Sequence, residues 1–256
     1  MYSLGFLVYY ITVMWHEVIG HGSLMYLFGC HHFVLTSTSI EASDVPSNAT
    51  TGTLRGRLIS MGGTFANLAL GFALFPLLKG MMRRGTDPMF SIFLWLLVAV
   101  NIFIGFIYPL YSGVFGVADW SEAIVGLPHH GLLRAIEIAI GMALSCLTVW
   151  TFAGFFSYFP ESLWRLSLIP YFSSAVVFCV AGLRIPNGTE LMIISVIPAA
   201  LLGQAILLLV TPIGRVRRKQ LSSMGTVPLS LTAIIVAFLF VGAILLTAPG
   251  VHFSVP

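Results

Sequence analysis

Two histidines and a glutamate lie close together in the first apolar stretch of the sequence, in the run His16-Glu17-Val18-Ile19-Gly20-His21. Imidazole is a good zinc ligand, and a carboxylate beside a zinc-bound water suits a general base. Ionisable groups within an apolar helix are costly unless they are paired or serve a function. The run therefore predicts a metal site with His16 and His21 as ligands and Glu17 as the base. Two histidines that are hydrogen-bonded inside a helix bundle are the alternative.

The spacing of these histidines does not fit a regular α-helix. His16 and His21 are five positions apart, which places them roughly 140° apart around a regular helix. The common His-Glu-x-x-His spacing leaves only about 40° between the two rings. A one-residue π-bulge would absorb the additional position, and such bulges favour functional sites. Because Gly20 and Gly22 make a distortion easier, we expect a wide or broken turn between His16 and Gly22.

A catalytic zinc ion usually takes three protein ligands, so a third is needed. Asp119 is one candidate, and Gly113 and Gly116 before it would let an irregular backbone approach a metal. The alternative is that Asp119 caps a short helix, since Asp119-Trp120-Ser121-Glu122 has the pattern of a capping box. Rival ligands are the remaining paired histidines, His31, His32, His129 and His130.

The elements that must position these groups are apolar helices. Of the 256 residues, 58% are hydrophobic and only 8% are charged, whereas a soluble domain has about 25% charged residues. This composition excludes an ordinary soluble globule, a disordered chain and a nucleic-acid binder. Apolar runs of about 20 residues predict an all-α integral membrane protein, a polytopic bundle of about seven transmembrane helices. The expected spans are 4–28, 58–78, 89–109, 132–156, 163–183, 191–212 and 227–248.

The segment between the first two expected spans differs from the other connections. Residues 33–40 are rich in β-branched and hydroxyl side chains, and 44–48 form a turn signal. With 50–58 as a return strand, this segment predicts a small β-hairpin, and a polar surface loop is the alternative. Basic residues cluster at 79–84 and 215–219, and the positive-inside rule makes both clusters cytoplasmic. The N-terminus of this multi-pass chain is therefore expected in the cytoplasm.

The histidine motif resembles the first catalytic helix of the site-2 protease family of intramembrane zinc metalloproteases, which carries His-Glu-x-x-His. The run 57–68 is similar to the family's next helix, where a small-residue segment leads to an asparagine near the active site. Asn67 matches that asparagine, and Gly62-Gly63 replaces the expected Gly-Pro. Asn67 could donate to a substrate carbonyl or a developing oxyanion, or it could hydrogen-bond a neighbouring helix. The resemblance covers about residues 5–125, without the Asn-Pro-Asp-Gly setting that often holds the third ligand.

The resemblance implies a zinc-dependent intramembrane peptidase. Its zinc ligands would be His16, His21 and an aspartate from a later segment, for which Asp119 is the best match because it follows the third expected span. Glu17 would be the general base. Its partners would be a membrane protein or peptide substrate and the lipid bilayer. Residues 1–128 would form a metalloprotease-like core and 129–256 four further helices of the same bundle. An edge strand within 33–40 could hold an unwound substrate by strand addition. Two alternatives remain, a membrane zinc hydrolase of a lipid or amide and a non-catalytic scaffold, which the histidine spacing favours.

Overall fold

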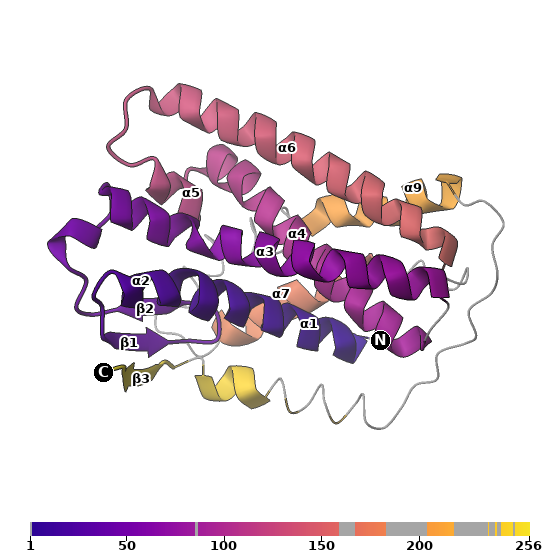
Figure 1. The fold of residues 1–256 in the computed structure, drawn as a ribbon, viewed down its shortest axis with the longest axis horizontal. Coiled ribbons are helices and arrows are strands. Elements are labelled where there is room, and N and C mark those ends of the chain that lie inside the picture. The colour runs from indigo at the N-terminus through magenta and orange to yellow at the C-terminus, as the bar shows by residue number, and fades with distance from the viewer. Residues whose placement is uncertain are drawn as a thin grey trace.

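The computed structural model describes residues 2–84, 87–158, 167–182, 204–217, 242–247 and 249–256, together with 235 and 239. These parts are mostly helical and carry one small sheet (Figure 1). In chain order the helical elements are α1 (Tyr2–Met14), η1 (Trp15–Gly22), α2 (Ser23–Leu27), η2 (Ser47–Ala49), α3 (Leu54–Arg84), α4 (Pro88–Phe115), α5 (Ala118–Ala123), α6 (His130–Gly154), η3 (Phe155–Tyr158), α7 (Leu168–Gly182), η6 (Gln204–Leu209) and α9 (Val210–Arg217). The strands are β1 (His32–Leu35), β2 (Ile40–Ala42) and β3 (Val251–Ser254).

Three of the described helices are long and apolar enough to cross a membrane: α3, α4 and α6. The shortest, α6, has 25 residues, which at about 1.5 Å per residue exceeds the roughly 30 Å of a bilayer's hydrocarbon core. The expected count of seven spans is not supported. The first expected span is helical throughout, but it passes from α1 through η1 to α2 and so does not form one long α-helix. Much of the last three expected spans lies outside the described residues.

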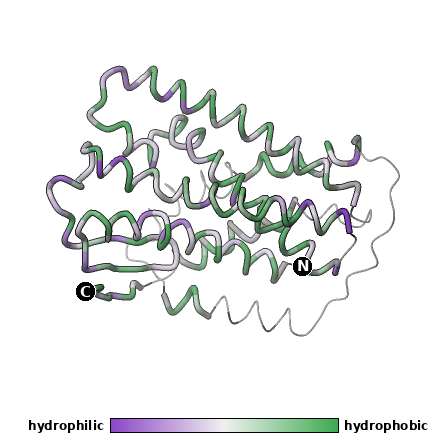
Figure 2. The backbone as a smooth tube through the Cα atoms, in the orientation of Figure 1, coloured by the Kyte–Doolittle hydropathy of each residue, from purple (hydrophilic) through white to green (hydrophobic). Residues whose placement is uncertain are grey.

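The core of the bundle lies around α4, which packs against α1, α3 and α6. Its Trp95 and Phe103 are fully buried, together with Phe152 of α6. The opposite side of α6 exposes large apolar side chains, among them Leu132 and Trp150. Figure 2 shows the long helices as largely apolar along their length. An outer helix with an exposed apolar face is what a lipid environment favours.

Two strands of the sheet, β1 and β2, form the expected β-hairpin, but the return strand is not residues 50–58. β2 pairs antiparallel with β1, with Val34 opposite Glu41. The turn is tight because the N–H of Thr36 donates to the carbonyl of Ser39 at 2.8 Å, while the Thr36 hydroxyl accepts from the Ser39 N–H. Residues 50–58 instead lead into α3.

The third strand, β3, follows the last expected span, where the sequence predicted no element. β3 pairs antiparallel with the other edge of β1, so the strand order is β2-β1-β3. Phe33 and Phe253 stack with their ring centroids 5.5 Å apart. In Figure 1 the sheet, α5 and the C-terminus lie at one end of the bundle, and the N-terminus lies at the other.

Candidate metal centre

The turn that carries the two histidines is a π-helix, as the spacing predicted. η1 interrupts an otherwise α-helical segment, and its hydrogen bonding extends to Ser23, whose N–H donates to the carbonyl of Val18 five residues earlier. Residues five apart therefore lie on one face of this turn. Accordingly His16 and His21 are both buried on the same side, with 3% and 7% of their surface exposed.

Three glycines fix the place of this turn against α3. A Cβ on Gly20 would lie 2.6 Å from the backbone nitrogen of Gly63 and 2.8 Å from the carbonyl carbon of Gly62, so the two backbones are in direct contact. A Cβ on Gly63 would overlap the imidazole of His16. The Trp15 indole N–H donates to the carbonyl of Ala66 at 2.9 Å and fastens the same turn to α3. The small-residue segment of α3 is thus the surface on which the histidine ring rests.

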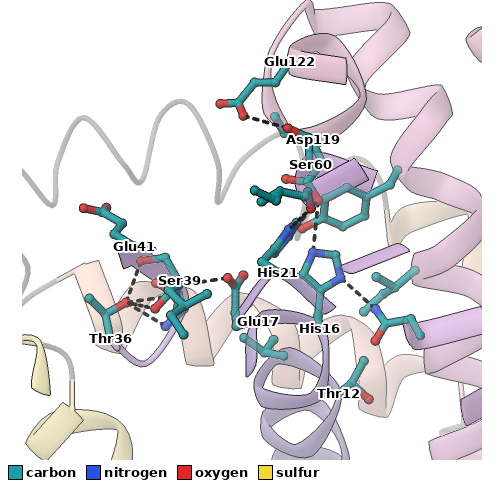
Figure 3. A pocket seen from close by; sticks show the side chains of 18 of the residues that line it. Thr12, His16, Glu17, His21, Thr36, Ser39, Glu41, Ser60, Asp119 and Glu122 are labelled. Carbon is teal, nitrogen blue, oxygen red and sulfur yellow. Dashed lines mark hydrogen bonds and ion pairs between the residues drawn. The ribbon is translucent and has the colours of Figure 1, made fainter. Parts of the chain in front are cut away.

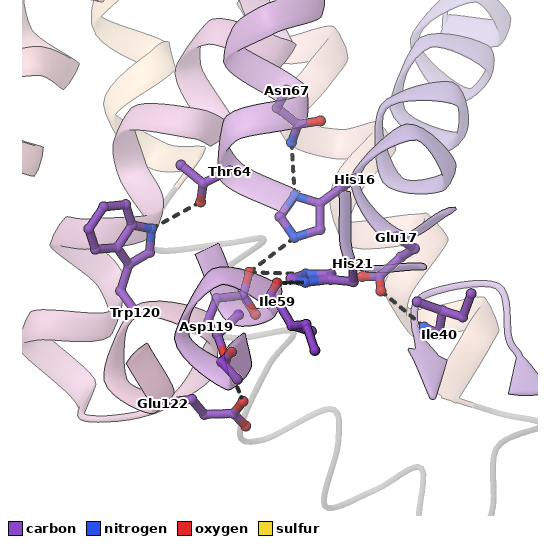
Figure 4. Close-up of polar contacts among 12 residues, drawn as sticks. His16, Glu17, His21, Ile40, Ile59, Thr64, Asn67, Asp119, Trp120 and Glu122 are labelled. Atoms are coloured by element: carbon purple, nitrogen blue, oxygen red, sulfur yellow. Dashed lines mark hydrogen bonds and ion pairs between the residues drawn. The ribbon is translucent and has the colours of Figure 1, made fainter. Parts of the chain in front are cut away.

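The two histidines meet Asp119 in one cluster (Figure 4). Oδ2 of Asp119 lies 3.1 Å from Nε2 of His16 and 3.5 Å from Nε2 of His21. The ligand atoms of all three residues lie within 4.8 Å of one another. Two ligands of a tetrahedral zinc ion, each at about 2.1 Å, are separated by roughly 3.4 Å. The group could therefore hold a metal ion with little rearrangement.

A distorted backbone places Asp119 beside the histidines. Gly116, the residue that caps the end of α4, has a left-handed φ of 70°, and Ala118 also has a positive φ of 66°. The start of α5 shows no side-chain cap, so Asp119 does not serve as the helix cap that the alternative predicted. The next residue, Trp120, donates its indole N–H to the hydroxyl of Thr64 at 3.0 Å and holds α5 on α3.

The surroundings of Asp119 favour its charged form. Burial alone would raise the pKa of its carboxyl, but the imidazole of His21, joined by that of His16, holds this pKa well below its usual value. A carboxylate that remains ionised between two imidazoles is prepared to bind a cation, because metal ligation requires the deprotonated form.

Both histidines are oriented by a second partner. Nδ1 of His21 lies 2.6 Å from the carbonyl oxygen of Ile59. Because a carbonyl only accepts hydrogen bonds, Nδ1 carries a proton. Nε2 is then the atom that faces Asp119, and it would offer its lone pair to a metal that displaces the proton there. Such hydrogen bonds fix the ring and the tautomer of a metal-binding histidine.

The corresponding partner of His16 is Asn67, a fully buried residue of α3. Its amide nitrogen lies 3.0 Å from Nδ1 of His16, and its buried Oδ1 has no hydrogen-bond partner among the described residues. A half-turn of the amide exchanges these two atoms. Oδ1 would then accept from Nδ1–H of the ring, which is the tautomer that binds a metal through Nε2, the atom that faces Asp119 at 3.1 Å.

Glu17 belongs to the same turn but does not join the cluster. Its Oε2 accepts a hydrogen bond from the backbone N–H of Ile40 in β2 at 3.0 Å. Figure 3 shows the carboxylate between the histidines and the hairpin. It therefore lies beside the candidate metal position without occupying it.

These groups line a cavity of about 420 Å³ between η1, the hairpin, α3, α4 and α5. Its polar wall includes Thr36 and Ser39 of the hairpin turn (Figure 3). Two exposed carboxylates, Glu41 and Glu122, also line it, and Glu122 accepts from the Ser60 hydroxyl at 3.3 Å. A cavity of this size that opens onto a metal site can admit part of a peptide chain.

The rival histidines lie elsewhere. His31 and His32 contact the C-terminal segment, through the Val255 carbonyl at 3.1 Å and the Ser254 hydroxyl at 2.8 Å. His129 and His130 are exposed at the start of α6. Among the described residues, the only group of three or more His, Cys, Asp or Glu side chains that could hold a metal is His16, His21 and Asp119.

Two contributors to the site were missed by the sequence analysis. The carbonyl of Ile59 has no signal in a sequence, because every residue carries a carbonyl. Tyr108 of α4 lines the cavity, and its ring lies 4.9 Å from the His16 ring between centroids. A tyrosine near the end of an apolar span is also expected at a membrane interface, so its type alone did not single it out.

Comparisons with known proteins add no assignment. No protein-family model matches the chain, and no curated protein or solved structure matches it either.

Proposed function

We propose that the protein is a zinc-dependent intramembrane peptidase with the chemistry of the site-2 protease family. The observation that carries the proposal is the convergence of two imidazole nitrogens and one carboxylate oxygen beside a glutamate that binds none of them. Three protein ligands leave the fourth tetrahedral position open, which is typical of catalytic zinc and not of structural zinc. The scaffold alternative loses its main support, because the π-helical turn brings both histidines to one face.

A zinc ion at this site would lower the pKa of a water molecule and polarise the scissile carbonyl. Glu17 would take a proton from this water as the water oxygen bonds to the carbonyl carbon. The same carboxyl would then give the proton to the amine nitrogen as the carbon–nitrogen bond breaks, leaving a carboxylate and an amine. The N–H of Ile40 holds one oxygen of Glu17 in place, which leaves the other to carry the proton.

The free edge of β2 offers a place for the substrate. The N–H of Ile40 points away from β1, toward Glu17, and by the alternation of an antiparallel ladder the polar groups of Ala42 point the same way. The opposite edge of β1 is covered by β3. A membrane helix must unwind before cleavage, because its carbonyls are engaged in hydrogen bonds. An unwound segment would pair by strand addition with the Ile40 carbonyl and the backbone of Ala42, since Glu17 holds the Ile40 N–H, and would pass over the cavity.

The charge distribution orients the site within the membrane. The last turn of α3 carries Arg83 and Arg84, and it lies at the same end of the bundle as the N-terminus (Figure 1). The positive-inside rule makes this end cytoplasmic, so the sheet and the cavity would face the opposite side. A topology reporter fused after Pro256 should therefore be active only on the non-cytoplasmic side. Activity of the reporter in the cytoplasm would reverse this orientation.

The decisive experiment for the function compares two carboxylates of one cavity. Purified full-length protein is reconstituted in liposomes with fluorogenic peptides and a reporter transmembrane helix, and cleavage and zinc content are measured. Glu17→Gln should keep one zinc per chain and lose cleavage by about 10²–10⁴-fold. Glu41→Gln removes an exposed carboxylate from the same cavity and should cleave normally. Full cleavage by Glu17→Gln, or a zinc-loaded wild type that cuts none of these substrates, would contradict the proposal.

A further inference from the structure

Tyr108 of α4 lines the cavity beside His16, and the proposed mechanism gives it no role. The ring of Tyr108 lies against His16, with centroids 4.9 Å apart and planes inclined by 38°. Tyr108 lines the same cavity as Asp119 and Glu17. Among the described residues no hydrogen bond to its hydroxyl is present. A phenol in this position can donate to a group that enters the cavity.

Three other donors that line the cavity or its hairpin wall are already engaged. The backbone N–H of Ile40 donates to Glu17, and the amide of Asn67 contacts His16. The Ser60 hydroxyl lies 3.1 Å from the Gly56 carbonyl and 3.3 Å from Glu122. A peptide carbonyl that becomes an oxyanion during hydrolysis needs a neutral donor in addition to a metal, because its charge develops where water is excluded.

We propose that the Tyr108 hydroxyl donates a hydrogen bond to the scissile carbonyl oxygen as that oxygen becomes negatively charged. This inference rests on the proposed peptidase function and assigns to Tyr108 the oxyanion contact that the sequence suggested for Asn67. Asn67 is then a positioning residue that acts through the ring of His16. The phenol keeps its proton throughout, so no bond to Tyr108 forms or breaks and the balance of the hydrolysis is unchanged.

The test separates transition-state contact from ground-state binding. Two inhibitors are titrated calorimetrically into zinc-loaded full-length protein: a phosphinic pseudopeptide, whose tetrahedral oxygens imitate the transition state, and a thiol peptide of the same sequence without such oxygens. In Tyr108→Phe we expect kcat to fall about 10²–10³-fold, with KM and zinc content close to wild type. The affinity for the phosphinic peptide should fall by a similar factor, while the affinity for the thiol stays the same.

Tyr111→Phe is the matched control, because Tyr111 is one helical turn further along α4 and lines the same cavity. It should bind both inhibitors as the wild type does. The inference is overturned if Tyr108→Phe binds the phosphinic peptide normally, if it loses zinc, or if Tyr111→Phe shows the same selective loss. Failure of the proposed function looks different: the wild type then contains no zinc, or Glu17→Gln remains active.

Discussion

Replacing Gly63 by alanine should remove the metal while changing a single methyl group. A Cβ at this position would lie 2.5 Å from Cδ2 of His16, whereas carbon atoms in good contact are about 3.5 Å apart. The ring must therefore move by about 1 Å, yet a metal site tolerates errors of only about 0.2 Å in ligand distance. Loss of a well-placed partner of a metal ligand typically costs 10–100-fold in affinity. Displacement of the ligand itself should cost at least about 100-fold.

The assay is competition for zinc against a fluorescent chelator, with helix content and thermal unfolding recorded in parallel. Gly71→Ala is the control for overpacking, because its Cβ would lie 2.5 Å from Cγ1 of Ile102, where α3 packs against α4 and away from the histidines. It should lower stability but bind zinc normally. Gly80→Ala meets nothing within 4 Å and should be neutral or stabilising by up to about 1 kcal/mol. Wild-type zinc affinity in Gly63→Ala would refute the packing argument.

Three further predictions concern the support of the site. Asn67→Ala should weaken zinc binding by about 10–100-fold in equilibrium dialysis, since it frees the ring of His16; unchanged affinity would remove its positioning role. Ala118→Gly should keep zinc and raise the free energy of unfolding, measured by chemical denaturation, by about 1 kcal/mol, because it relieves a positive φ of 66°. Ala118→Val should lower zinc occupancy. Equal stability and equal zinc occupancy in both variants would argue against strain at this residue. Desolvation raises the pKa of Asp44, but the N–H groups of His31 and His32 lower it more, so the net pKa lies below 3.8. Its stabilisation is therefore complete above that pH and lost below it, so Asp44→Asn should reduce the melting temperature at pH 7 and match the wild type in acid; an equal difference at both pH values would contradict this.

The sequence predicted the residues of the candidate site better than the architecture around them. The five-residue spacing of His16 and His21 required a wide turn, and the π-helix is that turn. The spacing carries this information because only a change of helical period can bring the two rings to one face. Asp119 was selected through the resemblance, as the aspartate that follows the third expected span, and it does lie beside both rings.

The parts that could not be predicted depend on contacts between distant segments. β3 is a strand because it pairs with an edge of β1, and residues 251–254 alone do not predict this pairing. The carbonyl of Ile59 orients His21, but backbone groups leave no trace in residue type. Apolar runs suggested seven spans, whereas only three described helices meet the length and hydropathy of a span. Hydropathy does not reveal a change of helical period, such as the one from α1 through η1 to α2.

The most direct test of the central claim is the metal content of the purified full-length protein. Wild type, His16→Ala and Glu17→Gln are compared by elemental analysis after removal of loosely bound ions. We expect one zinc per chain in the wild type and in Glu17→Gln, and none in His16→Ala. Absence of zinc from the wild type, or its retention in His16→Ala, would contradict a metal site formed by His16, His21 and Asp119.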